Sequence, residues 1–328
     1  MSTSTKIAFI GAGGIAGKHI QSLTKIQGVS IVGVCDVDAA KAAARAQEAD
    51  ARTFADVNEM LDAARPDGVY VCVPPHAHGP AEMACVKRRI PFIVEKPLSN
   101  DLAIARKIGS RVRAAGLIAA AAYQNRYRKG VRRARELLAD RPVSLIYGGW
   151  LGGTPAGHPW LTQKKLSGGQ ILEQTTHLFD LLRYLCGEAA AVHAFAARGF
   201  VARSPSYDTD DASSVVVRMK SGAVANIMSS WSAGPGGGVF LTLTGPDIRI
   251  SFSGWDQSMQ AADGGGKIQE SCPGEQNIFE VEDRAFVQAI RTGDPSSILC
   301  DYADGVKTLA LCAAANTSLE TGKPAAVR

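Results

Sequence analysis

The feature that most constrains this chain is a glycine turn between a short apolar run and an amphipathic segment near the N-terminus. Residues 6–20 read KIAFIGAGGIAGKHI, and the turn has the spacing G-x-G-x-x-A over Gly11, Gly13 and Ala16. An apolar run that ends in such a turn and continues as a helix is typical of the first strand and helix of a dinucleotide-binding fold. A glycine-rich turn without this purpose is the alternative, so residues further along must decide.

Each small residue of the turn has a physical role in that fold. Gly11 permits the sharp turn out of the strand, Gly13 lets a pyrophosphate approach the backbone, and Ala16 allows close packing of helix and strand. The N–H groups at the start of the helix, around Gly14 and Ile15, would then face the phosphates.

Asp36 supplies the second part of the pattern. It directly follows a second apolar run, residues 30–35, at the place where a carboxylate can bind the ribose hydroxyls. A carboxylate there repels a 2′-phosphate, so the sequence favours NAD over NADP as the cofactor. Lys41 and Arg45 follow further along, and they leave NADP open as the less favoured choice.

The order of apolar and helical segments predicts two domains, in keeping with a length of 328 residues. Residues 1–122 alternate short apolar runs with helices, which indicates an α/β Rossmann domain with a doubly wound parallel sheet. Period-two runs at 213–219, 223–230, 240–244 and 248–252 predict a mainly antiparallel sheet within an α+β domain over residues 123–328. We also expect one long helix over 171–186 and helices at 282–291 and 301–321.

Composition limits the class of protein. Hydrophobic residues are 46% and charged residues 20% of the chain, as in ordinary soluble proteins. The seven cysteines are odd in number and widely spaced, which indicates free thiols in a reducing compartment. Because no apolar run could span a bilayer and no secretory signal precedes the first strand, we expect a cytoplasmic protein without a membrane partner.

The charge pattern does not favour a nucleic-acid partner. The net charge is +5, and the basic residues are scattered except for a cluster over residues 126–135. This cluster falls on a predicted helix without an aromatic platform for bases. We therefore interpret it as a solvated helix face.

A lysine at the end of a parallel strand is the first catalytic candidate. The run Glu95-Lys96-Pro97 follows the apolar run 92–94, and the preceding proline-rich turn places Pro74 at the same edge of the predicted sheet. Open α/β sheets bind ligands at the carboxyl ends of their strands. An ammonium beside a bound nicotinamide can hydrogen-bond the reacting hydroxyl, and desolvation would favour the neutral amine needed for acid/base work. A surface lysine is the alternative.

The second candidate is a histidine in SGGQILEQTTHLFDLLRYLCG, residues 167–187. Glu173, His177, Asp180 and Tyr184 have helical spacing and would share one face of the predicted helix. A carboxylate one turn before a histidine can hold its tautomer and stabilise the imidazolium. We therefore expect His177 to take a proton from the substrate, with Glu173 as the group that orients it. A structural histidine on an apolar helix is the alternative.

With these motifs in place, the chain resembles the glucose–fructose oxidoreductase/inositol dehydrogenase (Gfo/Idh/MocA) family over essentially its whole length. The resemblance rests on Glu-Lys-Pro after its strand and on a pattern similar to G-G-x-x-x-D-x-G-x-H-x-x-D. This chain meets that pattern at Gly168, Gly169, His177 and Asp180, but has Glu173 for the aspartate and Thr175 for the glycine. The departures leave acid/base chemistry open and put the exact substrate in question.

The resemblance implies a Rossmann domain followed by a second domain with a large open sheet. It implies Lys96 as the catalytic lysine and Glu95 and Lys96 as cofactor contacts. The implied activity is NAD-dependent oxidation of a secondary hydroxyl of a sugar, cyclitol or related polyol. Either His177 or Lys96 could accept the hydroxyl proton. The family also implies a homodimer or homotetramer formed through the second-domain sheet.

Two other functions stay open within the same resemblance. Some relatives are NAD-dependent, redox-neutral glycosidases, in which transient oxidation enables elimination of a leaving group. Others are non-catalytic regulators that sense nucleotides or sugars, and these often lose the catalytic residues. This chain keeps Lys96 and His177, which favours an enzyme.

Two further residues are weaker candidates for substrate binding. Arg126, in AYQNRYRKG, follows the last Rossmann strand and suits a polyhydroxylated or acidic ligand. Trp160, in GHPWLTQKKLSGG beside His158, offers a flat face for a sugar ring or a packing anchor. No metal site is predicted, because the spacing of the only candidate set fits no closed zinc site: Cys72, His76, His78 and Cys85. We interpret His78 as shaping its loop.

Overall fold

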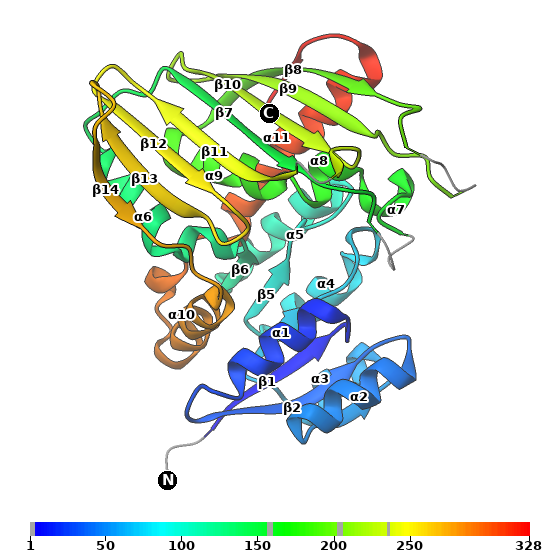
Figure 1. The fold of residues 1–328 in the computed structure, drawn as a ribbon. Coiled ribbons are helices and arrows are strands. Elements are labelled where there is room, and N and C mark those ends of the chain that lie inside the picture. Colours follow the sequence, from blue (N-terminus) through cyan, green and yellow to red (C-terminus); the bar gives the residue numbers. More distant parts are fainter. Residues whose placement is uncertain (1–3, 156–159, 202–205, 235–236) are drawn as a thin grey trace. The chain divides into compact units, whose positions relative to one another are not determined.

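The computed structural model describes residues 4–155, 160–201, 206–234 and 237–328, which form two compact units (Figure 1). The first unit comprises Met1–Gln124 and Asn277–Val306, and the second comprises Asn125–Gln276 and Lys307–Arg328. The expected boundary after residue 122 lies near the first junction. However, the segment Asn277–Val306 belongs to the Rossmann unit, so its assignment to the second domain needs correction.

The first unit contains a six-stranded parallel sheet in the order β3-β2-β1-β4-β5-β6. Its strands are β1 Thr5–Ile10, β2 Val29–Cys35, β3 Arg52–Phe54, β4 Gly68–Val71, β5 Phe92–Glu95 and β6 Ala119–Ala122. Its helices include α1 Gly14–Leu23, α2 Ala39–Ala49, α3 Val57–Ala64, η1 Pro75–Ala77, α4 Pro80–Arg88 and α5 Leu102–Ala115. Strand order reverses between β1 and β4, and this is the switch point at which such sheets bind ligands. The predicted Rossmann domain is confirmed.

Local sequence explains these elements. The strands are nearly continuous runs of buried apolar residues, as expected for a sheet covered on both faces. Three of the helices begin with an aspartate side chain that accepts backbone N–H groups of the first turn: Asp38 for α2, Asp56 for α3 and Asp101 for α5.

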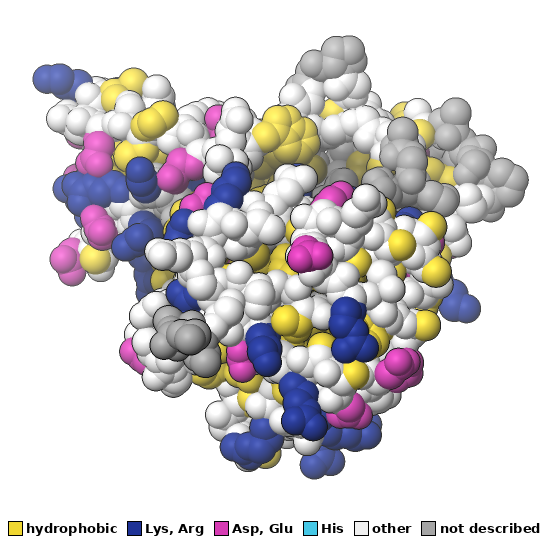
Figure 2. Space-filling view, turned by 90° about the horizontal axis from the view of Figure 1, so that it is seen from below, with side chains coloured by type: hydrophobic (Ala, Val, Ile, Leu, Met, Phe, Trp, Pro, Cys, Tyr) yellow, Lys and Arg dark blue, Asp and Glu magenta, His cyan; other side chains and the backbone are white. Residues whose placement is uncertain are grey.

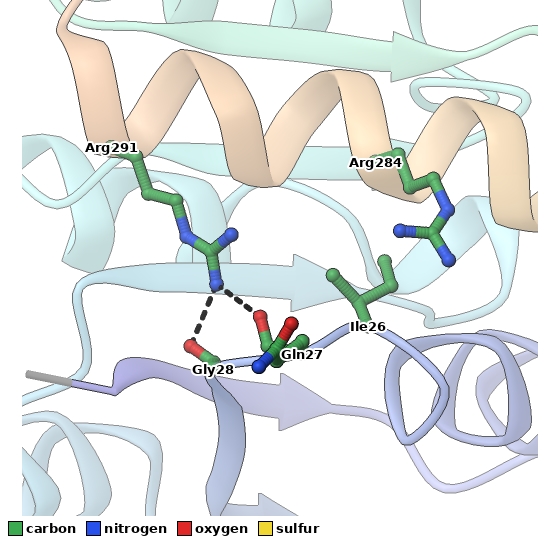
Figure 3. Close-up of a pocket in the computed structure, with 5 residues that line it drawn as sticks. All are labelled: Ile26, Gln27, Gly28, Arg284 and Arg291. Carbon is green, nitrogen blue, oxygen red and sulfur yellow. Dashed lines mark hydrogen bonds between the residues drawn. The ribbon is translucent and has the colours of Figure 1, made fainter. Parts of the chain in front are cut away.

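A late segment of the chain completes the Rossmann unit. Helix α10, Ile278–Thr292, buries Phe286 in the core of this unit. Near its C-terminal end, Arg291 donates hydrogen bonds to the carbonyl oxygens of Gln27 and Gly28 at 2.8 and 2.7 Å (Figure 3). η4, Pro295–Ser297, and the start of α11, Tyr302–Thr321, follow in the same unit. The helical pattern was readable from sequence, whereas the surface on which it packs was not.

The second unit contains a nine-stranded sheet in the order β14-β13-β12-β11-β7-β10-β9-β8-β15. Its strands are β7 Leu145–Leu151, β8 Ala189–Ala197, β9 Ala212–Met219, β10 Val224–Ser230, β11 Gly238–Thr244, β12 Ile248–Ser253, β13 Ser258–Asp263, β14 Ile268–Cys272 and β15 Ala325–Ala326. Strands β7 and β10 are parallel, and the other neighbours are antiparallel. The predicted large, mainly antiparallel sheet is confirmed.

Helices of the second unit line one side of this sheet (Figure 1). They include α6 Lys129–Leu137, which contacts β13 and β14, and α7 Lys164–Ser167. Next come α8, Gln170–Glu173, which contacts β10, and α9, Thr176–Cys186, which contacts β7. The functional histidine candidate therefore lies on the helical side of the sheet.

The single helix expected over residues 171–186 is wrong. Helix α8 ends at Glu173, and α9 begins at Thr176. Between them, the Thr175 N–H donates to the carbonyl oxygen of Gln170 at 3.0 Å, five residues back. A turn of that width inserts an extra residue into the helical repeat. Residues before and after the break therefore do not follow one continuous helical face.

The basic cluster over residues 126–135 is only partly a solvated face. Arg126 and Arg128 are buried, and Arg128 donates to the backbone carbonyl oxygens of Asp256 and Glu275. Arg133 pairs with the Glu270 carboxylate at 2.8 Å. Arg128 and Arg133 therefore make their contacts within the second unit. Elsewhere, on the face of the molecule that Figure 2 shows, Lys and Arg side chains lie among Asp and Glu side chains.

All seven cysteines are free, and only Cys186 and Cys272 are partly exposed. Among the helices of the described residues, none has the length and apolar character that a membrane crossing requires.

Candidate active site

The candidate cofactor residues of the first unit gather at the carboxyl ends of neighbouring parallel strands. The glycine turn follows β1, and Asp36 follows β2. Pro74 lies just beyond β4, and Lys96 follows β5. Because parallel strands end at one edge of the sheet, segments far apart in sequence contribute to one site.

The glycine turn is tightly packed on one side and open on the other. Gly11 has φ +95°, and a Cβ added there would lie 2.2 Å from the carbonyl oxygen of Cys72. A side chain at this position is therefore excluded by both conformation and space. By contrast, a Cβ added at Gly13 or Gly14 would meet nothing within 4 Å. This open space lies over the start of α1.

The start of α1 is suited to an anion. Gly13 is its N-cap, and within the described chain no side chain caps this helix, unlike the aspartate-capped α2, α3 and α5. Ala16 is fully buried, as close packing of helix and strand requires, and Ile15 is partly buried. The N–H groups of the first turn and the open space over Gly13 and Gly14 fit the pyrophosphate of a dinucleotide.

Asp36 connects the glycine turn to the end of β2. Its Oδ2 accepts the Ala12 N–H at 2.6 Å, and its Oδ1 accepts the Asp38 N–H at 2.8 Å. Asp36 is only partly buried, so its carboxylate keeps acceptor capacity for ribose hydroxyls. Its position at the turn is the one the sequence pattern predicts.

The turn that carries Lys96 is held by its neighbour. Glu95 is the last residue of β5, and its Oε2 accepts the Lys96 backbone N–H at 3.1 Å. Its Oε1 lies 3.1 Å from Nε2 of His19 on α1. The Lys96–Pro97 peptide bond is cis. The Glu95 carboxylate is buried and has protein partners at both oxygens, so direct contact with a cofactor stays a prediction.

In the second unit, His177 lies beside Trp150, which contacts Trp255 in turn, and sequence reasoning missed both tryptophans. His177 is in the first turn of α9 and is largely buried. Its ring stacks on Trp150 of β7, with centroids 5.6 Å apart and planes at 20°. Trp150 in turn meets Trp255 edge to face at 5.2 Å, and Trp255 is 62% exposed. No motif marks these two residues, because only the fold brings them to the histidine.

The break between α8 and α9 is fixed to β10 and the residue that follows it. Gln174 Oε1 accepts the indole N–H of Trp231 at 2.8 Å. The hydroxyl of Ser229 donates to Thr175 Oγ1 at 2.8 Å, and both groups are buried. Thr175, which replaces the glycine of the family pattern, therefore helps to hold the turn that leads into His177.

Glu173 and His177 are on different helices. Glu173 is the last residue of α8 and is buried, whereas His177 follows the wide turn. The expected polar face over Glu173, His177, Asp180 and Tyr184 is therefore wrong at its first member. An orienting role of Glu173 toward His177 stays a prediction.

Asp180 belongs to a buried ion pair. Its carboxylate accepts from Arg126 Nε at 2.8 Å and from Arg126 Nη2 at 2.6 Å, and from the Thr308 hydroxyl at 2.9 Å. The Arg126 guanidinium also lies over the Tyr184 ring at 4.9 Å. Arg126 is 2% exposed. This geometry supports a role in positioning α9 and gives no support to direct substrate contact by Arg126.

Trp160 lies in a separate hydrophobic cluster with Leu161, Tyr207 and Trp231. Of the two roles considered for Trp160, its surroundings fit the packing anchor. The tryptophan that contacts His177 is Trp150. His158 lies outside the described residues. Trp160 as a substrate contact therefore stays a prediction without support from its surroundings.

Of the residues considered for zinc, His78 has a carboxylate partner. His78 Nδ1 lies 2.6 Å from Glu82 Oε1, and Glu82 Oε2 accepts the Gly79 N–H at the start of α4. His78 thus shapes this loop. In the part of the chain that the structure describes, no group of three or more His, Cys, Asp or Glu side chains is arranged to hold a metal ion.

Comparisons with known proteins agree with this arrangement. Residues 5–123 match the oxidoreductase family with an NAD-binding Rossmann fold, and residues 131–254 match the GFO/IDH/MocA C-terminal domain. The chain is 25% identical over 326 residues to the myo-inositol 2-dehydrogenase of Thermotoga maritima, covering 96% of both chains.

Solved structures share the fold over the full length. GenD2 from gentamicin A biosynthesis, in complex with NAD, has a TM-score of 0.86 at 22% identity and covers 100% of this chain and 97% of its own. Levoglucosan dehydrogenase in complex with NADH has a TM-score of 0.87 at 19% identity, covering 99% and 100%. Two family matches cover most of the chain, and they agree with the glycine turn, the Glu-Lys-Pro turn and the large sheet. This chain therefore belongs to the GFO/IDH/MocA family of oxidoreductases with an NAD-binding Rossmann fold.

Proposed function

We propose that this chain is an NAD-dependent dehydrogenase that oxidises a secondary hydroxyl of a sugar, cyclitol or related polyol, or reduces the matching ketone. The observation that carries the proposal is the lysine turn held by Glu95 at the end of β5, at the sheet edge that bears the open, uncapped glycine turn. The full-length similarity to a myo-inositol 2-dehydrogenase supports the substrate class.

Lys96 and His177 have separate roles in the proposed oxidation of the hydroxyl. The glycine turn and Asp36 would hold NAD⁺, which would supply the hydride acceptor for oxidation at the carbinol carbon. The ammonium of Lys96 hydrogen-bonds the hydroxyl oxygen and stabilises the charge that develops there. His177 takes the hydroxyl proton as general base, while Trp150 holds its ring by stacking. Lys96 could instead accept the proton in its neutral form, and both assignments belong to the same proposal.

Aromatic faces beside His177 support a ring-shaped or polyhydroxylated substrate. Trp150 and Trp255 meet edge to face, and the exposed Trp255 indole offers an apolar face for the C–H groups of a sugar or cyclitol. We assign this part to Trp255 rather than to Trp160, which packs in another cluster.

Charges near Asp36 support NAD rather than NADP. The Asp36 carboxylate would repel a 2′-phosphate. The two nearby basic side chains have acidic partners on their own segment: Arg45 pairs with Glu48 at 2.7 Å and Lys41 with Asp38 at 3.1 Å. An NADP site uses an arginine for the 2′-phosphate, and here that arginine would first have to leave its carboxylate.

An exposed apolar face supports a homodimer or homotetramer. The strand register places Tyr147, Val216 and their neighbour Asn226 side by side on one face of the large sheet, and Leu145 pairs with Val224 on that same face. The four apolar residues are each at least 39% exposed. Apolar area of this kind is typical of subunit interfaces, so Val216→Arg should lower the oligomeric mass measured by light scattering, whereas Arg111→Ala on the exposed side of α5 should not.

The test is NADH formation by the purified protein over a panel of cyclitols, aldoses, anhydrosugars, linear polyols and hydroxy acids, with NAD⁺ and NADP⁺ in parallel. Lys96→Ala should lower kcat by about 10²- to 10⁴-fold, while Lys107→Ala on the exposed side of α5 should behave as the wild type. Full turnover by Lys96→Ala would contradict the proposal. Cleavage of glycosides without NADH accumulation would favour the redox-neutral glycosidase, and nucleotide binding without any turnover would favour a regulator.

A further inference from the structure

A buried chain of polar groups leads from helix α10 to the lysine turn. The Tyr70 hydroxyl of β4 donates to Asp283 Oδ1 of α10 at 3.0 Å. The same oxygen lies 2.7 Å from Nδ1 of His19 on α1. The other ring nitrogen of His19 lies 3.1 Å from Glu95 Oε1 at the end of β5. Glu95 Oε2 accepts the Lys96 N–H, so the chain ends at the turn that carries the candidate catalytic lysine.

His19 faces a carboxylate at each ring nitrogen, and this fixes its charge. A neutral imidazole has one N–H and can satisfy only one of two carboxylates, whereas the imidazolium donates to both. Burial by itself lowers the pKa of His19, but the charges and hydrogen bonds of Asp283 and Glu95 outweigh it and hold the pKa well above its usual value. The two carboxyl partners and the raised pKa therefore both favour the imidazolium form of His19.

Burial restricts the movement of the side chains that form this series of polar contacts. His19 and Asp283 are 0% exposed, Tyr70 is 1% and Glu95 is 6% exposed. The His19 ring also contacts Phe279 of α10 edge to face at 5.2 Å. Charge-assisted hydrogen bonds in a low-dielectric interior are strong and directional. The orientation of the Glu95 carboxylate is thus fixed from one side by His19 and from the other by the Lys96 N–H.

We propose that His19 is a positioning residue, which bridges Asp283 and Glu95 and thereby fixes the strand-end turn from which Lys96 acts. Through this bridge, α10 helps to set the geometry of the lysine even though it enters the Rossmann unit from far along the sequence. The inference rests on the proposed function of Lys96. It adds that His19, Asp283 and Tyr70 act on turnover without touching substrate or cofactor.

The test compares variants that break the His19 bridge with a variant that breaks a different contact of α10. Asp283→Asn and His19→Gln break the bridge. Arg291→Ala removes the hydrogen bonds of α10 to Gln27 and Gly28 and leaves the bridge intact. For each variant, kcat, the substrate KM, NADH affinity and the thermal midpoint are measured on the full chain.

The positioning role predicts that the bridge variants lower kcat but not NADH affinity, whereas the control variant lowers only the thermal midpoint. Asp283→Asn and His19→Gln should lower kcat by about ten- to a hundredfold, because a small misplacement of a catalytic group has that cost, with NADH affinity within about twofold of the wild type. Arg291→Ala should lower the thermal midpoint with an unchanged kcat of the folded protein. Tyr70→Phe, which keeps the ring and removes one donor to Asp283, should lower kcat by about threefold, on the order of one lost hydrogen bond.

The outcomes separate this inference from the proposed function. Full turnover by Lys96→Ala would overturn the proposed function. An inactive Lys96→Ala together with wild-type kcat in His19→Gln and Asp283→Asn would overturn the positioning role alone. If those two variants do not fold, Tyr70→Phe decides: wild-type kcat, or equal losses of kcat and NADH affinity, would overturn the bridge.

Discussion

The two units position their candidate residues in different ways. In the Rossmann unit, the cofactor region consists mainly of backbone groups and short turns at the ends of adjacent strands, such as the glycine turn and Asp36. In the second unit, His177 is positioned by side-chain contacts between distant segments, such as Trp150 and the Trp231–Gln174 hydrogen bond. Short motifs can specify the first kind of site, whereas the second kind depends on the assembled sheet.

Replacement of His177 should have the largest effect on activity. His177→Ala should lower kcat by about 10²- to 10⁴-fold, as for other general bases, and should leave NADH affinity unchanged, because the proposed pyrophosphate contacts are backbone groups of the glycine turn. The matched control is His193→Ala on β8, whose ring contacts Phe195. Equal kcat values for the two variants in steady-state assays would remove His177 from the mechanism.

Breaking the Arg126–Asp180 pair should mainly change stability. Asp180→Asn takes a carboxylate from a guanidinium that is 3% exposed, and loss of one partner of a buried pair costs about 3–5 kcal/mol. Glu136→Gln, which breaks a contact of the exposed Arg133, should cost less than about 1 kcal/mol. Denaturant unfolding of both variants measures the difference, and similar losses would show that the buried pair does not hold α9.

Asp36 should affect cofactor affinity without loss of the fold. Asp36→Asn weakens hydrogen bonds to a charged group, worth about 1.5–3 kcal/mol or roughly ten- to a hundredfold in NAD⁺ affinity. The control is Asp67→Asn, whose carboxylate accepts the Lys6 N–H at the opposite edge of the sheet. Calorimetric titration with NAD⁺ and NADP⁺ checks both. The account is contradicted if the two variants bind NAD⁺ equally well.

The smallest effect concerns the pH dependence of stability. The pKa of His19 is raised in the folded chain by Asp283 and Glu95 after the opposing effect of burial, and Tyr70 also packs against its ring. A raised pKa stabilises fully below the unfolded value of about 6.5 and loses its contribution as pH rises toward the folded value. Stability should therefore fall as the pH rises above about 6.5 toward the folded pKa, by up to about 1.4 kcal/mol per pH unit.

His19→Gln tests that slope directly. The variant has no group to titrate at this position, so its unfolding free energy should fall less steeply than that of the wild type over the same interval. Urea titrations at several pH values measure both slopes. Parallel curves would mean that His19 binds no extra proton on folding.

The sequence predicted the Rossmann half well because its signals are local. The strand, the glycine turn and Asp36 lie within one βαβ unit, and their spacing follows from backbone geometry. The contribution of Asn277–Val306 to that unit could not be predicted. His19 and Asp283 are 264 residues apart, and no sequence pattern connects residues at that distance.

The second unit shows where local patterns fail. A helical period over residues 171–186 suggested one helix, but Gln174 and Thr175 bond to Trp231 and Ser229, and these contacts accompany the wide turn. Arg126 looked available for substrate because its partner Asp180 is 54 residues away. Tertiary partners of polar side chains, which a single sequence does not reveal, decide these positions.

The most direct test of the central claim is hydride transfer from a deuterium-labelled polyol. The purified chain is incubated with NAD⁺ and the best substrate of the panel carrying deuterium on its carbinol carbons, and the NADH formed is examined by mass spectrometry and NMR. The account predicts deuterium at C4 of the nicotinamide in the wild type and loss of that signal in Lys96→Ala and His177→Ala. Turnover of the labelled substrate that puts no deuterium into NADH would contradict it.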